Sequence, residues 1–209
     1  MKLYEHPDSG NSHKVRLLMN FLSIPYDSVK VDLFEQEQNS APFLEINPRG
    51  EVPVLDDEGI ILRDSMAILV HLATNYDPKR LWLPEDTETY GAVMEWLAFS
   101  ASWIQYGVFT ARAAVAFGTM GNGLGWDFPV DPKEGQVRGR KSLEIMEKHL
   151  GQREWLTGDR CTIADIACFP YVALAPMGDV SLDPFNFVQA WINRFRDLPG
   201  FISMPGLDP

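Results

Sequence analysis

The chain has 209 residues, of which 45% are hydrophobic and 22% are charged, and its formal net charge is −11. This length and composition are typical of a globular protein of one or two domains with a sizeable core. The acidic balance, without a basic patch or tail, argues against nucleic acids and anionic membranes as partners.

The first 76 residues alternate between strand and helix patterns. A crossover helix separates the first two predicted strands, so we expect them to be parallel. The resulting β-α-β-α-β-β-α order is that of a thioredoxin-like α/β domain. The elements expected are a strand at 2–4, a helix through Val15 and Leu22, a strand at 28–31, a helix at 41–46, a hairpin ending at 60–62, and a helix that starts at Asp64 and Ser65.

The stretch Asn47-Pro48-Arg49-Gly50-Glu51-Val52-Pro53-Val54-Leu55 joins the two halves of this pattern. A cis Val52–Pro53 bond would point the Val52 N–H and C=O outward, where an extended peptide could pair with them. Asp64 and Ser65 would offer an ammonium ligand and a helix N-terminus for a carboxylate. The same spacing also fits an ordinary hairpin followed by an ordinary capped helix.

The remainder of the chain reads as a linker at 77–88 and an all-helical domain at 89–209. A long apolar and aromatic helix is expected at 89–117, and a Gly- and Pro-rich loop at 118–132. Thr162-Ile163-Ala164-Asp165 predicts a capping box that starts an apolar core helix. Further helices are expected at 134–150 and 183–198.

Cysteine and histidine usage points to neither disulfides nor a metal. Cys161 and Cys168 are seven residues apart on what reads as one helix, too far for a bond. His13 is expected in solvent beside Lys14, and no His or Cys has metal-ligand spacing. The chain starts directly with a strand and has no apolar run long enough for a membrane span, so we expect a soluble, cytoplasmic protein.

The loop after the first strand is the strongest candidate for chemistry. Ser9 and Ser12 have the spacing of a Cys-x-x-Cys redox motif, and the absence of cysteine there excludes dithiol exchange. A serine at a helix N-terminus can instead hydrogen-bond to a thiolate that a substrate supplies. Alternatively, Ser9 forms a turn and Ser12 caps the helix.

The stretch 47–55, followed by Leu62-Arg63-Asp64-Ser65-Met66-Ala67-Ile68, resembles the glutathione-binding half of glutathione S-transferases, and the resemblance covers essentially the whole chain. It is similar to serine-type, bacterial-like members with the theta, phi and zeta pattern. The resemblance implies a thiolate contact from Ser9, with Asn11 and Ser12 in reserve. The glutathione contacts it implies are Gln38, Asn39, Glu51, Val52, Pro53, Asp64 and Ser65.

Some of these positions depart from the family pattern. Gln38, Asn39 and Glu51 fall near the glycyl carboxylate of glutathione, and Glu51 adds a negative charge where relatives carry Gln or Lys. Asp64 is one methylene shorter than the usual Glu. These departures favour the alternative of a non-catalytic binding or interaction module.

The second-substrate pocket is expected on the long helix, from Trp96, Phe99, Ser100, Trp103, Tyr106 and Arg112. An aromatic stripe at helical spacing also fits core packing. Arg112 could bind an acidic group of a substrate, or pair with an acidic residue.

The resemblance implies a homodimeric glutathione transferase of detoxification, in which glutathione is the co-substrate and no metal takes part. Its thiolate would be conjugated to an electrophilic hydrophobic substrate. A glutathione-dependent isomerase, dehalogenase or disulfide reductase is the alternative on the same fold, and Asn11 would be the residue of interest in the reductase.

Overall fold

The computed structural model describes residues 1–118 and 131–207. Its N-terminal part has the predicted β-α-β-α-β-β-α order, with one short helical turn added. These elements are β1 (Lys2–Glu5), α1 (Gly10–Phe21), β2 (Asp27–Lys30), η1 (Glu37–Asn39), α2 (Ala41–Ile46), β3 (Val54–Asp57), β4 (Ile60–Leu62) and α3 (Ser65–Tyr76). The strand order is β2-β1-β3-β4, and the β1–β2 pair is parallel as expected.

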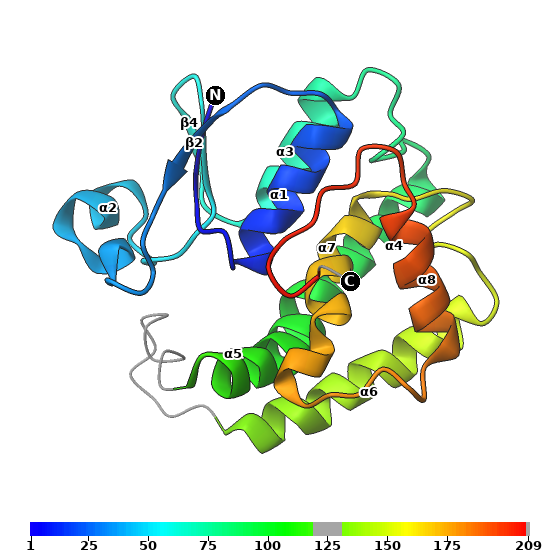
Figure 1. Ribbon diagram of the computed structural model, residues 1–209. Helices are drawn as coiled ribbons and strands as arrows, with labels where there is room; N and C mark the ends of the chain where they lie inside the picture. The colour runs from blue at the N-terminus through cyan, green and yellow to red at the C-terminus, as the bar shows by residue number, and fades with distance from the viewer. Residues whose placement is uncertain (119–130, 208–209) are drawn as a thin grey trace.

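The sheet has helices on both faces (Figure 1). Leu3 and Leu55 lie opposite each other in the β1–β3 pair and join the core beneath α1 and α3. Their neighbours Tyr4 and Val54 are also paired, and they pack with Phe43 of α2 on the other face. This is the alternation that the two-residue period of a strand requires.

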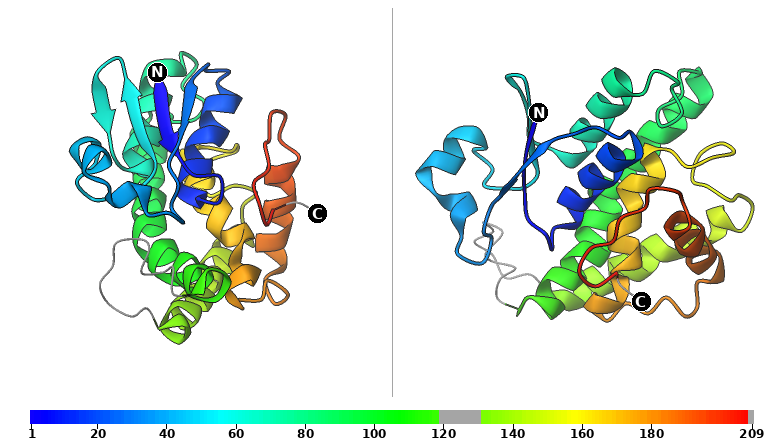
Figure 2. Two further views of the ribbon diagram at one scale, coloured as in Figure 1. Left: turned by 60° about the vertical axis from the view of Figure 1, so that its left-hand side comes forward. Right: turned by 45° about the horizontal axis from the view of Figure 1, so that its top comes forward.

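The C-terminal part is all helical and packs beside the sheet domain (Figure 2). The predicted single helix from 89 to 117 is continuous, but its middle section has the wider π-helical hydrogen-bond pattern. Most of the predicted Gly- and Pro-rich loop lies outside the described residues. The elements are α4 (Thr87–Phe99), η2 (Ser100–Phe109), α5 (Thr110–Ala116), α6 (Pro132–Leu150), α7 (Ile163–Ala173), η4 (Ala175–Gly178) and α8 (Asn186–Arg196).

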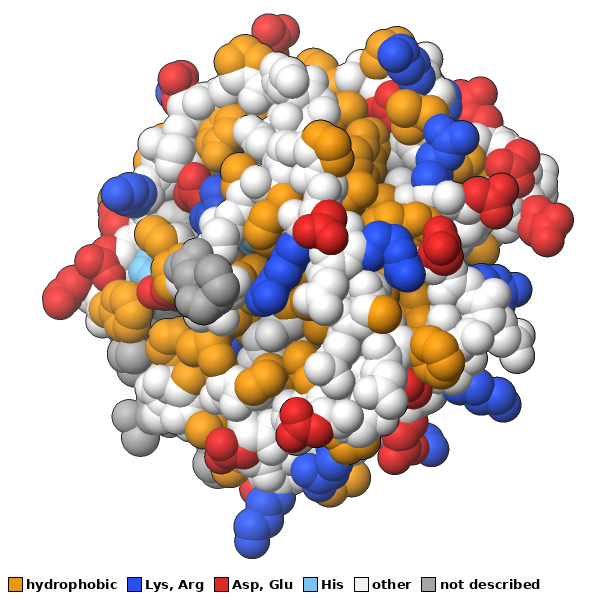
Figure 3. Space-filling model, turned by 45° about the vertical axis from the view of Figure 1, so that its right-hand side comes forward, with side chains coloured by type: hydrophobic (Ala, Val, Ile, Leu, Met, Phe, Trp, Pro, Cys, Tyr) orange, Lys and Arg blue, Asp and Glu red, His pale blue; other side chains and the backbone are white. Residues whose placement is uncertain are grey.

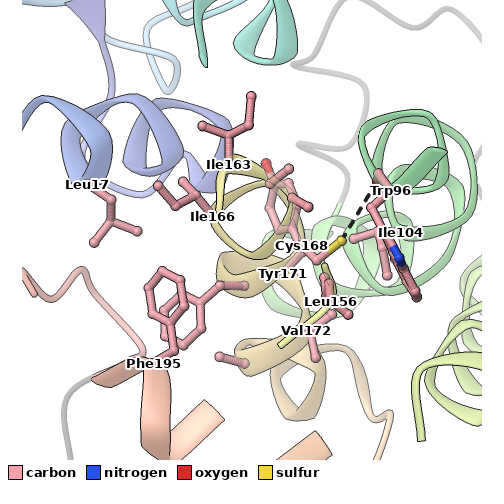
Figure 4. Close-up of a cluster of buried hydrophobic side chains, with 14 of the residues drawn as sticks. Leu17, Trp96, Ile104, Leu156, Ile163, Ile166, Cys168, Tyr171, Val172 and Phe195 are labelled. Atoms are coloured by element: carbon pink, nitrogen blue, oxygen red, sulfur yellow. Dashed lines mark hydrogen bonds between the residues drawn. The ribbon is translucent and has the colours of Figure 1, made fainter. Parts of the chain in front are cut away.

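Helix α7 is the centre of the molecule, and all of its residues are buried. Figure 4 shows its side chains meeting residues of α1, α4, η2 and α8. The predicted capping box is confirmed: the Thr162 side chain accepts from the Ala164 N–H, and Asp165 accepts from the Thr162 N–H at 2.9 Å. Asp165 also accepts from the Leu156 N–H at 3.0 Å and the Trp191 indole at 2.9 Å.

The burial of α1 differs from the expectation. His13 and Lys14 are fully buried rather than solvated, because α1 packs against both α3 and α7. Cys161 and Cys168 are both free and buried, and Cys161 lies before α7 rather than within it.

The charge distribution on the surface and the character of the helices complete the description of the fold. On the face shown in Figure 3, Lys and Arg side chains are interspersed with Asp and Glu side chains instead of forming one basic area. Among the described helices, none combines the length and apolar character needed to cross a membrane.

Candidate active site

A polar cleft lies between the sheet domain and the helices η2 and α7. The α1 N-terminus, the loop before β3 and the α3 N-terminus supply its polar wall, and η2 supplies the facing wall. We refer to it as the polar cleft. Its lining residues are Ser9, Asn11, Leu33, Arg49, Gly50, Glu51, Val52, Asp64, Ser65, Met66, Ala101, Gln105, Tyr106, Phe109 and Tyr171.

The two serines of the first loop have different positions. Ser9 is the N-cap of α1, and its hydroxyl oxygen accepts from the Ser12 N–H at 3.1 Å. Ser12, expected as the cap or as a reserve for the thiol contact, is instead fully buried and accepts from the His6 N–H at 3.4 Å. Ser9 and Asn11 therefore line the cleft, whereas Ser12 does not.

Tyr171 of α7 lies at the floor of the cleft, and the sequence reasoning missed it. Its hydroxyl accepts from the Asn11 N–H at 3.1 Å and hydrogen-bonds with the Ser9 side chain. Burial raises the pKa of Tyr171 to about 12, so the phenol is neutral at physiological pH. The available signal was a lone phenol in an otherwise apolar helix, since a buried Tyr hydroxyl usually has a partner.

Gly10 allows this close approach. A Cβ atom at that position would lie 2.5 Å from the Tyr171 ring. The glycine therefore lets the first turn of α1 rest directly on α7, and it fixes the distance between the two domains at the cleft.

Lys14 is a buried cation behind the same wall. Its Nζ donates to the Asn11 Oδ1 at 2.8 Å and lies 5.0 Å from the centre of the Tyr171 ring. The Ser65 hydroxyl donates to the same Asn11 oxygen at 3.4 Å. With its oxygen occupied by two donors, the Asn11 amide has its NH₂ group left for a ligand. Burial lowers the pKa of Lys14 to about 8.

The loop before β3 has the geometry that the resemblance implies. The Val52–Pro53 peptide is cis, and Val52 lies outside the β1–β3 pairing, which reaches only to Val54. The Asn47 side-chain amide donates to the Glu51 carbonyl at 2.7 Å and holds this loop in place. Val52 and Glu51 line the cleft, whereas Pro53 is buried beside it.

The α3 N-terminus provides the other polar end of the cleft. Asp64 is the N-cap, and its carboxylate accepts from the Met66 N–H at 2.8 Å. Arg49 lies 3.6 Å from the Asp64 carboxylate, and both side chains are exposed. Burial raises the pKa of Glu51, and the nearby Arg49 charge opposes this shift.

Besides Pro53, two of the expected glutathione contacts do not line the cleft. Gln38 is fully buried. Asn39 is exposed, donates to the Gln36 side chain at 3.3 Å, and packs behind Gly50. Neither residue lines the cleft, because η1 lies on the outer side of the loop that carries Gly50.

Most of the expected aromatic stripe lies away from the cleft. Trp96 packs against Phe99 and His149, and Phe99 and Trp103 stack with ring centres 6.3 Å apart. Ser100 is buried and donates to the Ala167 carbonyl. These side chains follow one helical face, whereas the cleft is lined from another, by Ala101, Gln105, Tyr106 and Phe109. Tyr106 is thus the single residue of the stripe that reaches the cleft.

An apolar cavity adjoins the polar cleft, and we keep this name for it. The two hollows share Ser9, Leu33, Phe109 and Tyr171. The other residues that line the apolar cavity are His6, Asp8, Phe34, Arg112, Ala113 and Phe117. Arg112, expected in the second-substrate pocket, is thus beside Ser9 but outside the polar cleft.

The acid and base groups of the described residues give no metal centre. No cluster of three or more His, Cys, Asp or Glu side chains in that part of the chain could hold an ion. The arrangement instead offers neutral donors at a helix N-terminus, backed by a buried ammonium group. Such donors stabilise an anion, for example a thiolate.

Comparisons with known proteins agree with this geometry. The model of the glutathione S-transferase N-terminal domain matches residues 3–80, and that of the glutathione S-transferase C-terminal domain matches residues 129–199. Glutathione S-transferase hmp2 of Hypomyces subiculosus is 32% identical, covering 87% of this chain and 88% of its own. The disulfide-bond oxidoreductase YfcG of Escherichia coli (strain K12) is 28% identical, and the match covers 94% of this chain and 90% of YfcG.

Solved structures are similar over nearly the full length. A possible glutathione S-transferase from Rhodopseudomonas palustris superposes with a TM-score of 0.86 at 33% identity, covering 97% of each chain. A glutathione transferase family member from Pseudomonas fluorescens Pf-5, solved with two glutathione bound, has a TM-score of 0.80 at 26% identity, covering 95% and 89%. With the sheet order, the cis Val52–Pro53 bond and the two matched domains, these likenesses place the chain in the glutathione S-transferase superfamily of enzymes.

Proposed function

We propose that the protein conjugates glutathione to an electrophilic apolar substrate. The observation that carries the proposal is the position of Ser9 and Asn11, which lie at the α1 N-terminus beside Tyr171. Ser9 and Tyr171 line both hollows, so a sulfur atom held there would meet a second substrate in the apolar cavity. The helix N-terminus and the Asn11 amide would stabilise its thiolate form.

Glutathione would lie along the polar cleft. The Val52 backbone would pair with the cysteinyl residue like an added strand. Asp64 would bind the γ-glutamyl ammonium group, and Ser65 at the α3 N-terminus its carboxylate. Arg49 is the cation that lines the cleft near Glu51, and it would offset that negative charge for the glycyl carboxylate.

In the reaction, the thiol loses its proton to solvent and the thiolate attacks the electrophilic carbon. A carbon–sulfur bond forms, and the leaving group departs with the bonding electron pair. The enzyme contributes mainly proximity and thiolate stabilisation. Tyr171, as a neutral phenol, holds the Asn11 backbone and the Ser9 hydroxyl in place rather than acting as the base.

The test is glutathione binding by calorimetry at pH 7, with ultraviolet absorbance of the bound thiolate. Ser9→Ala and Asn11→Ala should bind glutathione but show less thiolate, and the larger loss identifies the sulfur contact. Ser102→Ala is the control, since that exposed hydroxyl donates to the Ala98 carbonyl away from the cleft. If wild type shows no binding at millimolar glutathione, a non-catalytic module replaces the proposal.

A second candidate is glutathione-dependent disulfide reduction, favoured by the likeness to YfcG and by the NH₂ group of Asn11. A first glutathione thiolate attacks a disulfide and releases one thiolate. A second glutathione then attacks the mixed disulfide, so glutathione is oxidised and the substrate reduced. Reduction of hydroxyethyl disulfide that falls more in Asn11→Ala than in Ser9→Ala would support this activity over conjugation.

We also propose a homodimer in the cytoplasm with a role in detoxification, as is usual for the family. Light scattering coupled to gel filtration tests the oligomeric state directly. A monomer at micromolar concentration would contradict the dimer without affecting the proposed chemistry.

A further inference from the structure

The guanidinium of Arg112 lines the apolar cavity with a hydrogen-bonding position unfilled. Only 3% of Arg112 is exposed. Its Nη1 donates to the Asp8 backbone carbonyl at 3.2 Å and its Nε to the Met177 sulfur at 3.4 Å. The Phe117 ring lies 4.8 Å away. Within the described part of the chain, Nη2 is buried and has no hydrogen-bond partner.

Among the described residues, no acidic side chain lies within ion-pair distance of this group, although the Asp8 charge acts on it from farther away. Arg112 forms no ion pair with an acidic side chain among those residues. Asp8 lines the same cavity, but it contacts Arg112 through its backbone carbonyl. The ion pair considered from the sequence is therefore absent here. Burial lowers the pKa of Arg112, yet a guanidinium stays protonated in proteins.

A buried, unpaired cation is unfavourable in the free protein. It becomes favourable when a ligand brings the missing anion, because a charge-assisted hydrogen bond in a water-poor site is strong. A guanidinium has the planar donor pattern that matches a carboxylate. Arg112 therefore has the properties of a ligand-binding group rather than of a structural ion pair.

The rest of the cavity limits the kind of ligand. Phe34, Phe109, Ala113 and Phe117 give it apolar walls, and His6 is held neutral because burial lowers its pKa. Among the described residues that line the cavity, Arg112 is the single cation and Asp8 is the single acidic residue. A ligand that fills this space would be apolar and largely aromatic, with one negative group at the Arg112 end.

We propose that the acceptor substrate is an aromatic or similarly apolar acid, whose carboxylate binds Arg112 while its electrophilic carbon faces Ser9. This inference rests on the proposed function, since it names the substrate class of that site. Arg112 acts here as a specificity-determining residue and takes no part in bond making.

Binding of unreactive probes tests the anion subsite by itself. The probes are 3,5-dinitrobenzoate and its methyl ester, which differ in charge but hardly in shape, titrated by calorimetry with and without S-methylglutathione. Wild type should bind the acid at least about tenfold more tightly than the ester, the effect of one good charged contact. Equal affinities in wild type overturn the proposal without any variant.

Two variants locate the effect. Arg112→Met should abolish the preference for the acid, and Arg112→Lys should keep part of it. The matched control is Arg138→Met, which removes an arginine that lies over Trp103 outside both hollows, 5.3 Å from the ring centre. If Arg138→Met also abolishes the preference for the acid over the ester, the overall charge of the protein is responsible for it, and the Arg112 subsite is refuted.

Turnover separates this inference from the proposed function. With 4-chloro-3,5-dinitrobenzoate, the glutathione thiolate forms a carbon–sulfur bond and chloride leaves with the electron pair, while the thiol proton goes to the buffer. We expect a kcat/KM about tenfold above that of the methyl ester, and no such ratio in Arg112→Met. An Arg112-dependent preference in binding without turnover would keep the anion subsite and refute conjugation.

Discussion

Asp165 should be the most sensitive single position for stability. It is fully buried, and each of its hydrogen bonds has the carboxylate as acceptor. The donors are the Leu156 N–H, the Thr162 N–H, the Trp191 indole N–H and, at a longer 3.4 Å, the Thr162 hydroxyl. A hydrogen bond to a charged group contributes about 1.5–3 kcal/mol. Even with relief of the buried charge, Asp165→Ala should cost about 4 kcal/mol, a large part of a typical stability.

Two further variants sharpen this prediction. Asp165→Asn keeps one oxygen but directs an NH₂ group at a donor, so we expect a loss of about 2 kcal/mol. The matched control is Asp86→Ala, an exposed N-cap whose carboxylate accepts from the Thr89 backbone N–H at 2.8 Å and also hydrogen-bonds with the Thr89 side chain. Such a cap contributes about 1 kcal/mol.

The measurement is urea unfolding, followed by tryptophan fluorescence. It is carried out at pH 8, because burial raises the pKa of Asp165 to about 6 and the carboxylate must be ionised. The free energy of unfolding is compared at a common m-value. If Asp165→Ala lowers the free energy of unfolding by no more than Asp86→Ala does, the buried hydrogen-bond network contributes nothing beyond an ordinary N-cap, and the reasoning is refuted.

Three other predictions concern two buried titratable groups of α1 and the close packing of η4 on α5. Burial lowers the pKa of His13 to about 3, so the unfolded chain takes up a proton near pH 6.5 and the folded chain does not. The contribution of this group to the free energy of unfolding is therefore complete above that pH, and wild type should lose about 2 kcal/mol of it between pH 7 and pH 5. In His13→Leu, urea unfolding should show a smaller drop in the free energy of unfolding over the same pH range. Lys14→Met removes a buried charge that has no counter-ion within ion-pair distance, so at pH 7 it should raise the free energy of unfolding by up to about 3 kcal/mol. The same variant should bind glutathione more weakly. A variant that is both less stable and weaker in glutathione binding would contradict the idea that Lys14 serves the ligand at the expense of stability. Gly178→Ala places a Cβ 2.5 Å from the backbone of α5, and should cost about 1–3 kcal/mol; Gly91→Ala, with open space around it, should slightly raise the melting temperature.

The local features of the fold could be predicted from the sequence. The Val52–Pro53 turn, the Asp64 cap and the Thr162–Asp165 capping box all depend on residues within a few positions of one another. Turn and cap chemistry is a property of short segments, so these signals survive without knowledge of the tertiary structure. The order of elements along the chain and the parallel first pair of strands could be predicted as well, whereas the strand order within the sheet was not.

The residues that lie behind the cleft could not be predicted in this way. Tyr171 contacts Asn11 across 160 positions of the chain, and the burial of Lys14 depends on α7 covering α1. Which members of the aromatic stripe reach the cleft could not be told either, because periodicity gives which residues share a face but not what that face contacts. The π-helical section η2 further changes which side chains reach the cleft, and no local signal marked it.

The contact of α1 with α7 through Gly10 has a consequence for how ligands reach the site. The buried core is continuous from Leu3 of the sheet to Phe195 of α8, so the two halves of the chain share one interior. A hinge motion between them would separate the Tyr171 ring from the first turn of α1 and break the hydrogen bond to Asn11. We therefore expect ligands to reach the site through the mouths of the two hollows, with the two halves of the molecule held to each other by their shared core.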